Sequence, residues 1–419
     1  MDRALNSMQV AALLISASYG IGFLFGSGEM ALTHGMAGSI YGLVTAVGML
    51  LLTFFAARLW RGGRAVWDLF GQVYGPSMKH GVALLSIIWM AGVLAAQIHG
   101  GVAILRLLGL GEWLAFAVVL SGVLIASRLN LGLASTVFAL FLLGSGFVLL
   151  YALLSGSGGP FYVRGPVLFA QALSTFSVAS LVSITVAVVA LVVTGADYHQ
   201  FLLAARRPLD ATLGCLLAAV ALVALSFVPA SVVLGLQQDG GLVGLGDNKQ
   251  VIPFALTHAA AGLGVAAMGK VFLIGILGAA LGSGAAILRA MTSALETATD
   301  GRASGERVWS SVLVLGIGAA LAIRGQGIID TMVSVNVIYI ASIMITFGFM
   351  ITGRPLPIRC AVWGVLTGFT VSSAVYVLSW ARVIGGNADL LSLIAGLGAS
   401  VVVLAGVGVQ LRTQSARKA

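Results

Sequence analysis

Long apolar stretches, each about 20 residues in length, dominate the hydrophobic pattern of this chain. They lie at 8–30, 37–57, 81–104, 112–127, 131–154, 170–194, 210–235, 264–288, 309–323, 328–352, 358–380 and 388–411. A stretch of this length crosses the hydrocarbon core of a bilayer as an α-helix. The pattern therefore predicts an all-α integral membrane protein with about twelve transmembrane helices.

The basic residues predict which ends of these helices face the cytoplasm. If the N-terminus lies inside, the inner segments hold most of the 22 lysines and arginines. Inner loops of membrane proteins carry this excess of positive charge. We therefore expect a protein of the inner (plasma) membrane with both termini in the cytoplasm and a short cytoplasmic tail at 412–419.

Two long connections divide the predicted helices into repeats. One, 59–80, follows the second helix on the inner side, and the other, 237–263, follows the seventh helix on the outer side. Each comes after the second helix of a five-helix set and contains an amphipathic stretch. This pattern predicts a 5+5 inverted repeat, 8–154 and 170–353, within a single transporter domain that covers 1–419. Two additional peripheral helices follow at 357–411.

Composition and motifs exclude several classes of protein. Hydrophobic residues make up 59% of the chain and charged residues 8%, compared with about 25% charged residues in a soluble protein. The net charge of +9 is scattered among apolar runs, which argues against a nucleic-acid partner. Cys215 and Cys360 are too isolated for a disulfide framework or a zinc site, and no nucleophile elbow or Walker A motif occurs. We expect neither an enzyme nor a cofactor.

The first apolar stretch is the most unusual, because glycines recur at 20, 22, 26 and 28. Each glycine weakens a helix by about 1 kcal/mol relative to alanine. We expect this helix to break between Ser18 and Gly22 and to expose backbone groups to an ion and a solute. The alternative is close helix packing through the spacing of Gly22 and Gly26.

Small and polar positions within the predicted helices supply candidates for a solute site. We expect six residues to border the solute: Gly20, Gly22, Phe23, Gln97, Ser177 and Ser180. For Gln97 the alternative is a hydrogen bond between helices, and for the serines it is a bond to a carbonyl of their own helix.

Charged and titratable residues supply two further groups of candidates. Glu29 lies inside a predicted span and His34 follows it, so either could carry a proton; the alternative is that both reach the lipid headgroups. Four residues follow the sixth apolar stretch, where we expect an inner interface and gate: Asp197, His199, Arg206 and Arg207.

Several segments resemble the sodium:solute symporter family, whose members have the inverted-repeat fold of the bacterial leucine transporter. The strongest are Ala-Val-Trp-Asp-Leu-Phe-Gly-Gln-Val-Tyr-Gly at 65–75, Ala-Ala-Gln-Ile-His-Gly-Gly at 95–101, and Ala-Asp-Tyr-His-Gln-Phe-Leu-Leu-Ala-Ala-Arg at 196–206 with Asp-Ala-Thr-Leu-Gly at 210–214. The resemblance covers the first eight helices.

The resemblance implies a sodium ion held by carbonyls of the broken first helix and by a carbonyl and two hydroxyls of the eighth. Aligned on this chain, those ligands fall on Ser16, Tyr19, Ala280, Ser283 and Gly284. Gly284 departs from the family, which usually has a second serine there. Phe23 stands where sugar-transporting members have a polar residue, which argues against a sugar.

Together these observations predict a secondary active transporter that moves a small polar organic solute with sodium by alternating access. Inward sodium movement releases about 2.3 kcal/mol per charge per 100 mV. Its partners are the solute, the sodium ion and the lipid bilayer. A proton-coupled symporter or uniporter of the same fold, and a transporter-like sensor or partner subunit, remain alternatives.

Overall fold

The computed structural model describes residues 3–129, 144, 146–262, 266–300 and 307–418, and the described part is almost entirely helical. The helices of the first half are α1 (Ser7–Ser18), α2 (Ile21–His34), η1 (Gly35–Ser39), α3 (Ile40–Gly62), α4 (Val66–Tyr74), α5 (Pro76–Leu107), α6 (Glu112–Ala126) and the helix Gly146–Ser155. Those of the second half are α8 (Gly158–Val163), α9 (Gly165–Ala172), η2 (Leu173–Thr175), α10 (Val178–Thr194), α11 (Ala196–Leu203), α12 (Pro208–Gln238), η3 (Asn248–Gln250), α13 (Val251–Gly262), α14 (Ala266–Ala298), α15 (Arg307–Ile323), α16 (Ile328–Ile351), α17 (Ile358–Trp380) and α18 (Ala388–Lys418).

These helices confirm the expected arrangement of about twelve spans. Within the described residues, 8 helical segments are long and apolar enough to cross a membrane, and shorter apolar helices stand at the first, fourth, fifth and ninth positions. Residues 130–143 and 145 of the fifth predicted span lie outside the described part of the chain.

The first span is broken where the glycines predicted it. α1 ends at Ser18 and α2 begins at Ile21, with Gly20 extended between them at φ −84° and ψ −177°. A break of this kind leaves carbonyls at the end of one helix and amides at the start of the next without helical partners. The expected break in the first helix is therefore confirmed.

The sixth span is not the single helix that the sequence predicted over 170–194. Ser177 starts α10 as its N-cap, accepting a hydrogen bond from the N–H of Ser180 at 3.1 Å, and Phe176 before it is extended. At the other end Gly195 separates α10 from the short helix α11. The first helix of each predicted repeat is thus interrupted, a feature that the sequence indicated for one of them only.

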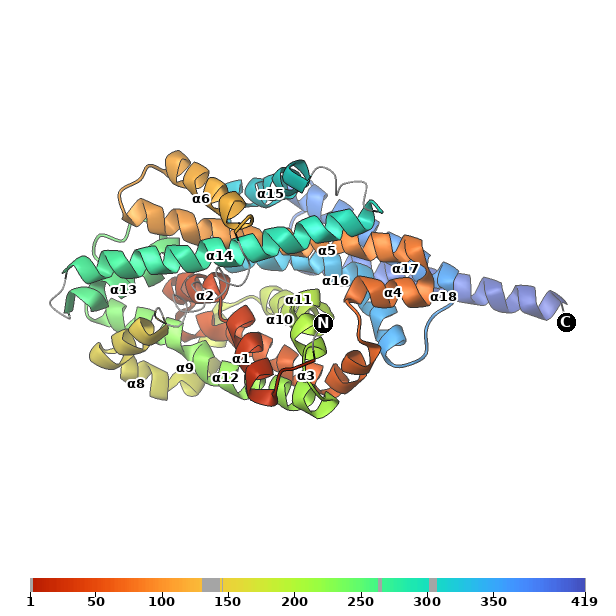
Figure 1. Cartoon of the computed structure of the whole chain (residues 1–419), viewed down its shortest axis with the longest axis horizontal. Helices are drawn as coiled ribbons and strands as arrows, with labels where there is room; N and C mark the ends of the chain where they lie inside the picture. The colour runs from red at the N-terminus through yellow and green to blue at the C-terminus, as the bar shows by residue number, and fades with distance from the viewer. Residues whose placement is uncertain (1–2, 130–143, 145, 263–265, 301–306, 419) are drawn as a thin grey trace.

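The long helices run nearly parallel along the bundle. α5 and α14 lie side by side, and α3 and α1 both pack on α12 (Figure 1). α4 and α13, formed by the two amphipathic connections, lie at opposite ends of the bundle (Figure 1). We refer to these as the Arg206 end, which carries α4, and the Glu29 end, which carries α13.

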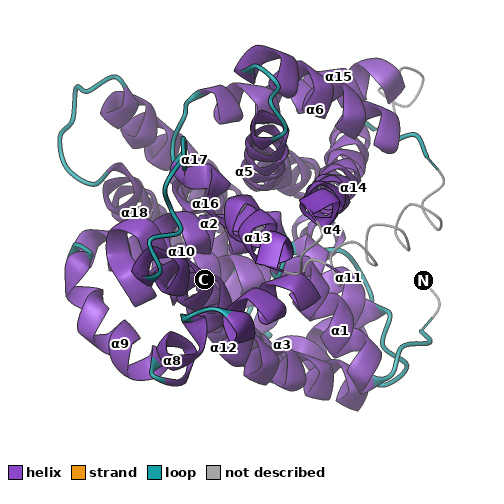
Figure 2. Ribbon diagram, turned by 90° about the vertical axis from the view of Figure 1, so that its left-hand side faces the viewer, coloured by secondary structure: helices purple, strands orange, loops and turns teal. Residues whose placement is uncertain are grey.

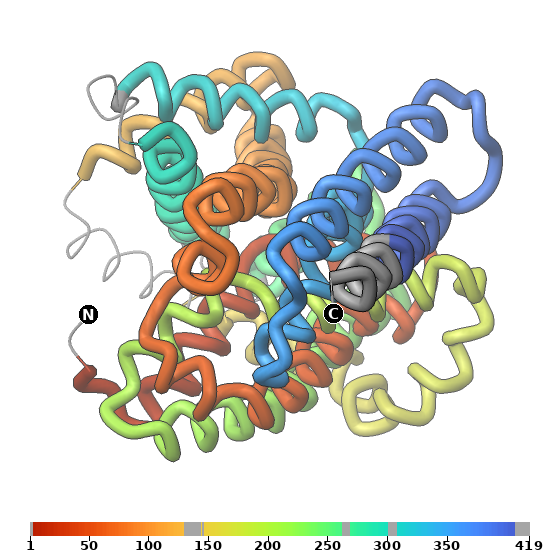
Figure 3. Tube along the Cα trace, turned by 90° about the vertical axis from the view of Figure 1, so that its right-hand side faces the viewer, coloured from red at the N-terminus to blue at the C-terminus, as the bar shows by residue number. Residues whose placement is uncertain are grey.

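α17 and α18 form a pair at the side of the bundle. They pack on each other and on α16, and views from both ends show them outside the central helices (Figures 2 and 3). This confirms the expectation of two peripheral C-terminal helices.

Candidate functional site

The two helix breaks meet in the interior of the bundle. Ser18, the last residue of α1, lies beside the side chain of Tyr198 in α11, and both residues are buried. α1 and α11 also pack on each other. Backbone groups that lack helical partners are tolerated at membrane depth only where they line a cavity or contact protein. The meeting point of the breaks is therefore the natural place for a ligand.

Aromatic side chains and a thioether surround the start of α2. The Phe23 ring lies 4.9 Å from the ring of Tyr19 and 6.3 Å from that of Tyr41. The Tyr41 hydroxyl lies 3.9 Å from the sulfur of Met332, and that sulfur is 3.2 Å from where a Cβ on Gly22 would be. The structure thus brings the predicted residues Gly22 and Phe23 together with two residues that the sequence did not indicate, Tyr41 and Met332.

Gln97 of α5 lies between the broken first helix and α14. Its Nε2 is 4.0 Å from the Cβ position of Gly20, and its own Cβ is 3.6 Å from the Cβ position of Gly284. The side chain is buried, and its Oε1 has no hydrogen-bond partner among the described residues. A buried acceptor without a donor costs about 1–3 kcal/mol. This cost would be recovered if Oε1 contacted an ion or a solute.

The residues proposed for sodium fall in two places. Gly284 is buried against Val123 of α6 beside Gln97, and Ala280 and Ser283 lie on the preceding turn of α14. Ser16 and Tyr19 instead line an apolar cavity of about 560 Å³ between α1, α12 and the helix Gly146–Ser155. The ligands expected from α1 are backbone carbonyls, so the exposed side chain of Ser16 does not remove them. The ion site stays a prediction.

A second cavity, of about 470 Å³, lies at the Glu29 end. Ser177 and Ser180 line it with Glu29, His34 and Asp330. The six residues expected around one solute are therefore divided between two places. The reason is the local chain path: because Ser177 caps α10, both serines lie at the beginning of that helix rather than at its middle.

Glu29 and His34 each contact another helix at this end. Oε2 of Glu29 accepts the N–H of Ile328 at 2.9 Å, at the N-terminus of α16. The His34 ring stacks on Phe176 with centroids 3.9 Å apart, and its Nδ1 lies 3.1 Å from Oγ1 of Thr175. These contacts tie α2 to α16 and to the segment before α10.

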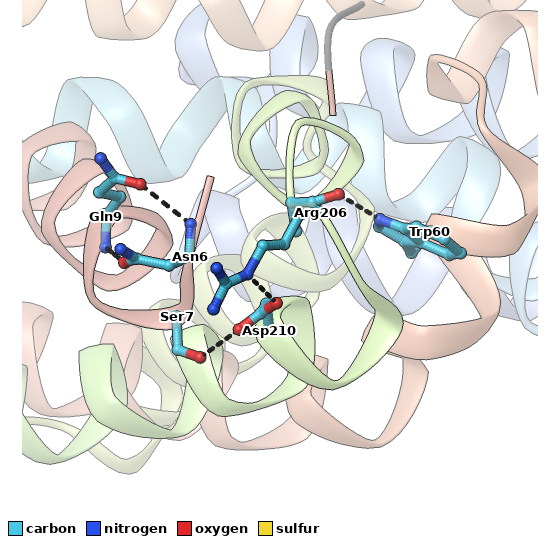
Figure 4. Close-up of polar contacts among 7 residues, drawn as sticks. Asn6, Ser7, Gln9, Trp60, Arg206 and Asp210 are labelled. Carbon is cyan, nitrogen blue, oxygen red and sulfur yellow. Dashed lines mark hydrogen bonds and ion pairs between the residues drawn. The ribbon is translucent and has the colours of Figure 1, made fainter. Parts of the chain in front are cut away.

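A polar network closes the Arg206 end (Figure 4). Asp210 accepts a hydrogen bond from Ser7 at 2.7 Å and pairs with Arg206 at 2.9 Å, which ties α1 to α12. Trp60, at the end of α3, donates its Nε1–H to the carbonyl of Ala205 at 2.7 Å, and the Arg3 guanidinium lies over the Trp60 ring at 3.9 Å. A capping box formed by the two polar residues Asn6 and Gln9 starts α1 beside this network (Figure 4).

Of the residues assigned to an inner gate, Arg206 lies in this network, whereas Asp197 and His199 do not. His199 is 1% exposed, and its Nε2 lies 2.8 Å from the carbonyl of Val193. Asp197 lies at the start of α11, directly after the helix break. Gly195 was the signal in the sequence that could have placed Asp197 inside the bundle, because it ends the helix two positions earlier.

No protein-family model matches the sequence, and no curated protein matches it. Solved transporters are nevertheless similar in fold. A Na+-coupled sialic acid symporter in a substrate-bound outward-open state has a TM-score of 0.63 and 14% identity, covering 96% of this chain and 89% of that chain. Mhp1, a nucleobase-cation-symport-1 family transporter in a closed conformation with bromovinylhydantoin bound, has a TM-score of 0.58 and 16% identity, covering 96% and 92%. MhsT in complex with L-phenylalanine has a TM-score of 0.55 and 12% identity, covering 98% and 99%.

These similarities extend over nearly the whole chain and confirm the fold class. The chain has the inverted-repeat transporter fold that its resemblance to the sodium:solute symporter family implied. The first two of these similar structures are a symporter and a transporter.

Proposed function

We propose that this chain is a secondary active transporter that moves a small polar organic solute together with sodium. The observation that carries the proposal is the meeting of the two helix breaks, where Ser18 contacts Tyr198 inside the bundle. Broken helices of this kind offer carbonyls to a cation and amides to a polar solute near the midplane. The similarity in fold to sodium-coupled symporters supports the same reading.

Alternating access would use the two closed ends. At the Glu29 end, the bond from Ile328 to Glu29 holds α2 against α16. At the Arg206 end, Asp210 holds α1 against α12 through Ser7 and Arg206. Release of one contact at a time would open the central site to one side of the membrane. In this proposal the Arg206 end and both termini face the cytoplasm.

The proposed sodium site joins the carbonyls of Ser16 and Tyr19 to Ala280 and Ser283 of α14. Gly284 supplies no hydroxyl, but the unpartnered Oε1 of Gln97 belongs to a side chain that packs beside it. We assign the place of the missing hydroxyl to this amide oxygen. Sodium is a hard cation that prefers several oxygen ligands, and an amide carbonyl is such a ligand.

Sodium binding is tested by thermal stability of the purified protein in detergent. The melting temperature is measured in sodium and in potassium at matched ionic strength. Binding to the folded state stabilises by about 2.7 kcal/mol when the ion is at 100 times its Kd. Ser283→Ala should abolish the sodium-specific rise. Ser293→Ala, an exposed serine further along α14, should keep it. A sodium response unchanged in Ser283→Ala would remove the ion site.

Proton coupling is the second candidate, and the position of Glu29 favours it. Its carboxylate lies at a contact between helices that must separate during transport, so protonation would weaken that contact. A stability that depends on pH, not on sodium, and that loses this dependence in Glu29→Gln would support protons as the coupling ion.

A further inference from the structure

The carboxylate of Asp197 stands at the centre of the bundle, in the first turn of α11. It folds back over the break, because its Oδ1 lies 2.6 Å from where a Cβ on Gly195 would be. The backbone N–H of Tyr198 lies near this carboxylate. Oδ1 itself is buried and has no hydrogen-bond partner among the described residues.

Three tyrosines from three helices surround this carboxylate. Tyr41 of α3, Tyr198 of α11 and Tyr339 of α16 are all close enough to interact with it electrostatically. Two of their hydroxyls bond elsewhere: that of Tyr41 to Met332, and that of Tyr339 to the carbonyl of Thr194 at 3.3 Å. Oδ1 of Asp197 therefore stays available beside three aromatic side chains.

Asp197 also lacks a counter-charge. Within the described residues the ion pairs join Lys79, His80, Arg106 and Arg206 to other acids, and none of them includes Asp197. A charged group inside a membrane is costly, and such groups pair with an opposite charge or serve function. A ligand with a positive charge would supply the missing partner.

The surroundings favour an organic cation over sodium at this carboxylate. Sodium prefers several oxygen ligands, whereas three of the neighbours of Asp197 are aromatic side chains. A positively charged nitrogen suits both features, because it pairs with a carboxylate and is attracted to aromatic faces. Tyr41 connects this position to Phe23 and Met332, so a solute beside α2 would reach it.

We propose that Asp197 binds the positively charged nitrogen of the solute, with Tyr41 as one wall of the nitrogen site. The solute class is accordingly small amines, which includes amino acids and quaternary ammonium compounds. This inference rests on the proposed transport function and names its substrate class. It does not depend on which ion drives transport.

The experiment compares charged compounds with their uncharged or deaminated analogues. Two pairs of compounds are used: choline with its uncharged analogue 3,3-dimethylbutanol, and alanine with its deaminated analogue lactate. Wild type and Asp197→Asn are titrated with each compound in sodium and in potassium, and the melting temperature is measured. Choline or alanine should stabilise the wild type, and its partner compound should not. Asp197→Asn, which keeps the size of the side chain, should weaken that binding about 100-fold or more. Asp68→Asn, in α4 outside the bundle core, serves as the matched control.

The sodium response separates this inference from the proposed function. Asp197→Asn should keep the sodium-specific rise of the wild type, because Ser283 is intact. If the wild type shows no sodium response but loses amine binding in Asp197→Asn, sodium coupling fails and the amine site stands. If Asp197→Asn loses the sodium response instead, Asp197 is an ion ligand and the inference is overturned. A wild type that responds to neither amine, or equally to both members of a pair, also overturns it.

A second pair of variants covers the case in which Asp197→Asn fails to fold. Tyr41→Phe keeps the ring, and Tyr41→Leu removes it while keeping an apolar side chain. Loss of one cation–π contact should weaken amine binding by about tenfold in Tyr41→Leu and leave it nearly unchanged in Tyr41→Phe. Equal affinity in the two variants would contradict a nitrogen site at this ring.

Discussion

A hydroxyl placed at position 284 should tighten sodium binding, and the structure sets the size of the effect. A Cβ on Gly284 would lie 3.0 Å from a methyl of Val123 and 3.6 Å from the Cβ of Gln97. Both neighbours are side chains, so a shift of a few tenths of an ångström at Val123 admits a serine. A polar contact to a charged partner contributes about 1.5–3 kcal/mol, and tight packing costs part of this. We therefore expect Gly284→Ser to lower the Kd for sodium by about tenfold.

Gly284→Ala is the matched control for this measurement. Both substitutions replace a glycine inside α14, which by itself raises helix stability by about 0.5–1 kcal/mol whether or not sodium is present. Only serine adds an oxygen. In a sodium titration of melting temperature, the alanine variant should shift the whole curve upward, and the serine variant should also move its midpoint to lower sodium concentration. Coincident midpoints for the two variants would refute an ion beside Gly284.

The role given to Gln97 adds a second arm to the same titration. Gln97→Ala removes the unpartnered amide oxygen and should raise the Kd for sodium by about tenfold. If that oxygen takes the place of the missing hydroxyl, Gln97→Ala combined with Gly284→Ser should return the Kd close to that of the wild type. A double variant as weak as Gln97→Ala alone would mean that the two groups do not serve the same ion.

Three further predictions follow from contacts elsewhere in the bundle. Glu29→Gln removes the charge from the bond to Ile328, which should weaken closure of the Glu29 end by about 1–2 kcal/mol and speed thiol labelling of a cysteine introduced at Ser180; unchanged labelling would argue against a gate. Asp210→Asn removes the charged partner of Arg206 and weakens the hydrogen bond from Ser7, so proteolysis near the N-terminus should become faster. Equal rates of proteolysis in wild type and variant would show that this network does not close the Arg206 end. Gly42→Ala places a Cβ 2.3 Å from the Phe23 ring and should destabilise the protein by about 1–3 kcal/mol in thermal unfolding, whereas Gly81→Ala, with no atom within 4 Å, should not.

The sequence indicated the break in the first helix but not the break in the sixth, for a physical reason. Around Gly20 four glycines lower helix propensity over several turns, and such a weakness is visible without a structure. Between α10 and α11 the sixth helix is interrupted at a single glycine, Gly195, directly after a run of β-branched and apolar residues. A single glycine costs about as much as one favourable packing contact, so tertiary structure decides whether the helix continues.

The separation of Ser177 and Ser180 from Phe23 has a similar cause. Their spacing by three positions is compatible with one helical face, and the count of apolar residues placed that face at the middle of a span. What the count could not include is the N-cap, because Ser177 satisfies the amide of Ser180 and begins α10 at that point. For Asp197 the difference is the opposite one. We expected it at the cytoplasmic surface, but it lies in the interior because the chain continues as α11 after the break.

The polar atoms without partners at the centre of the bundle argue that this region is built for a ligand rather than for stability. Besides Gln97 and Asp197, Asn336 of α16 is fully buried, and both polar atoms of its side chain lack partners among the described residues. It lies one helical turn beyond Met332, which contacts Gly22. Each unpaired group costs about 1–3 kcal/mol, and apolar residues of similar shape would remove that cost. The side chains of Gln97, Asp197 and Asn336 come from three different helices, each of which lies next to a helix break. A bound ion and solute that form hydrogen bonds or ion contacts with all three side chains would therefore draw these helices together. The free energy recovered on binding can therefore drive closure around the solute, which is the coupling that a symporter requires.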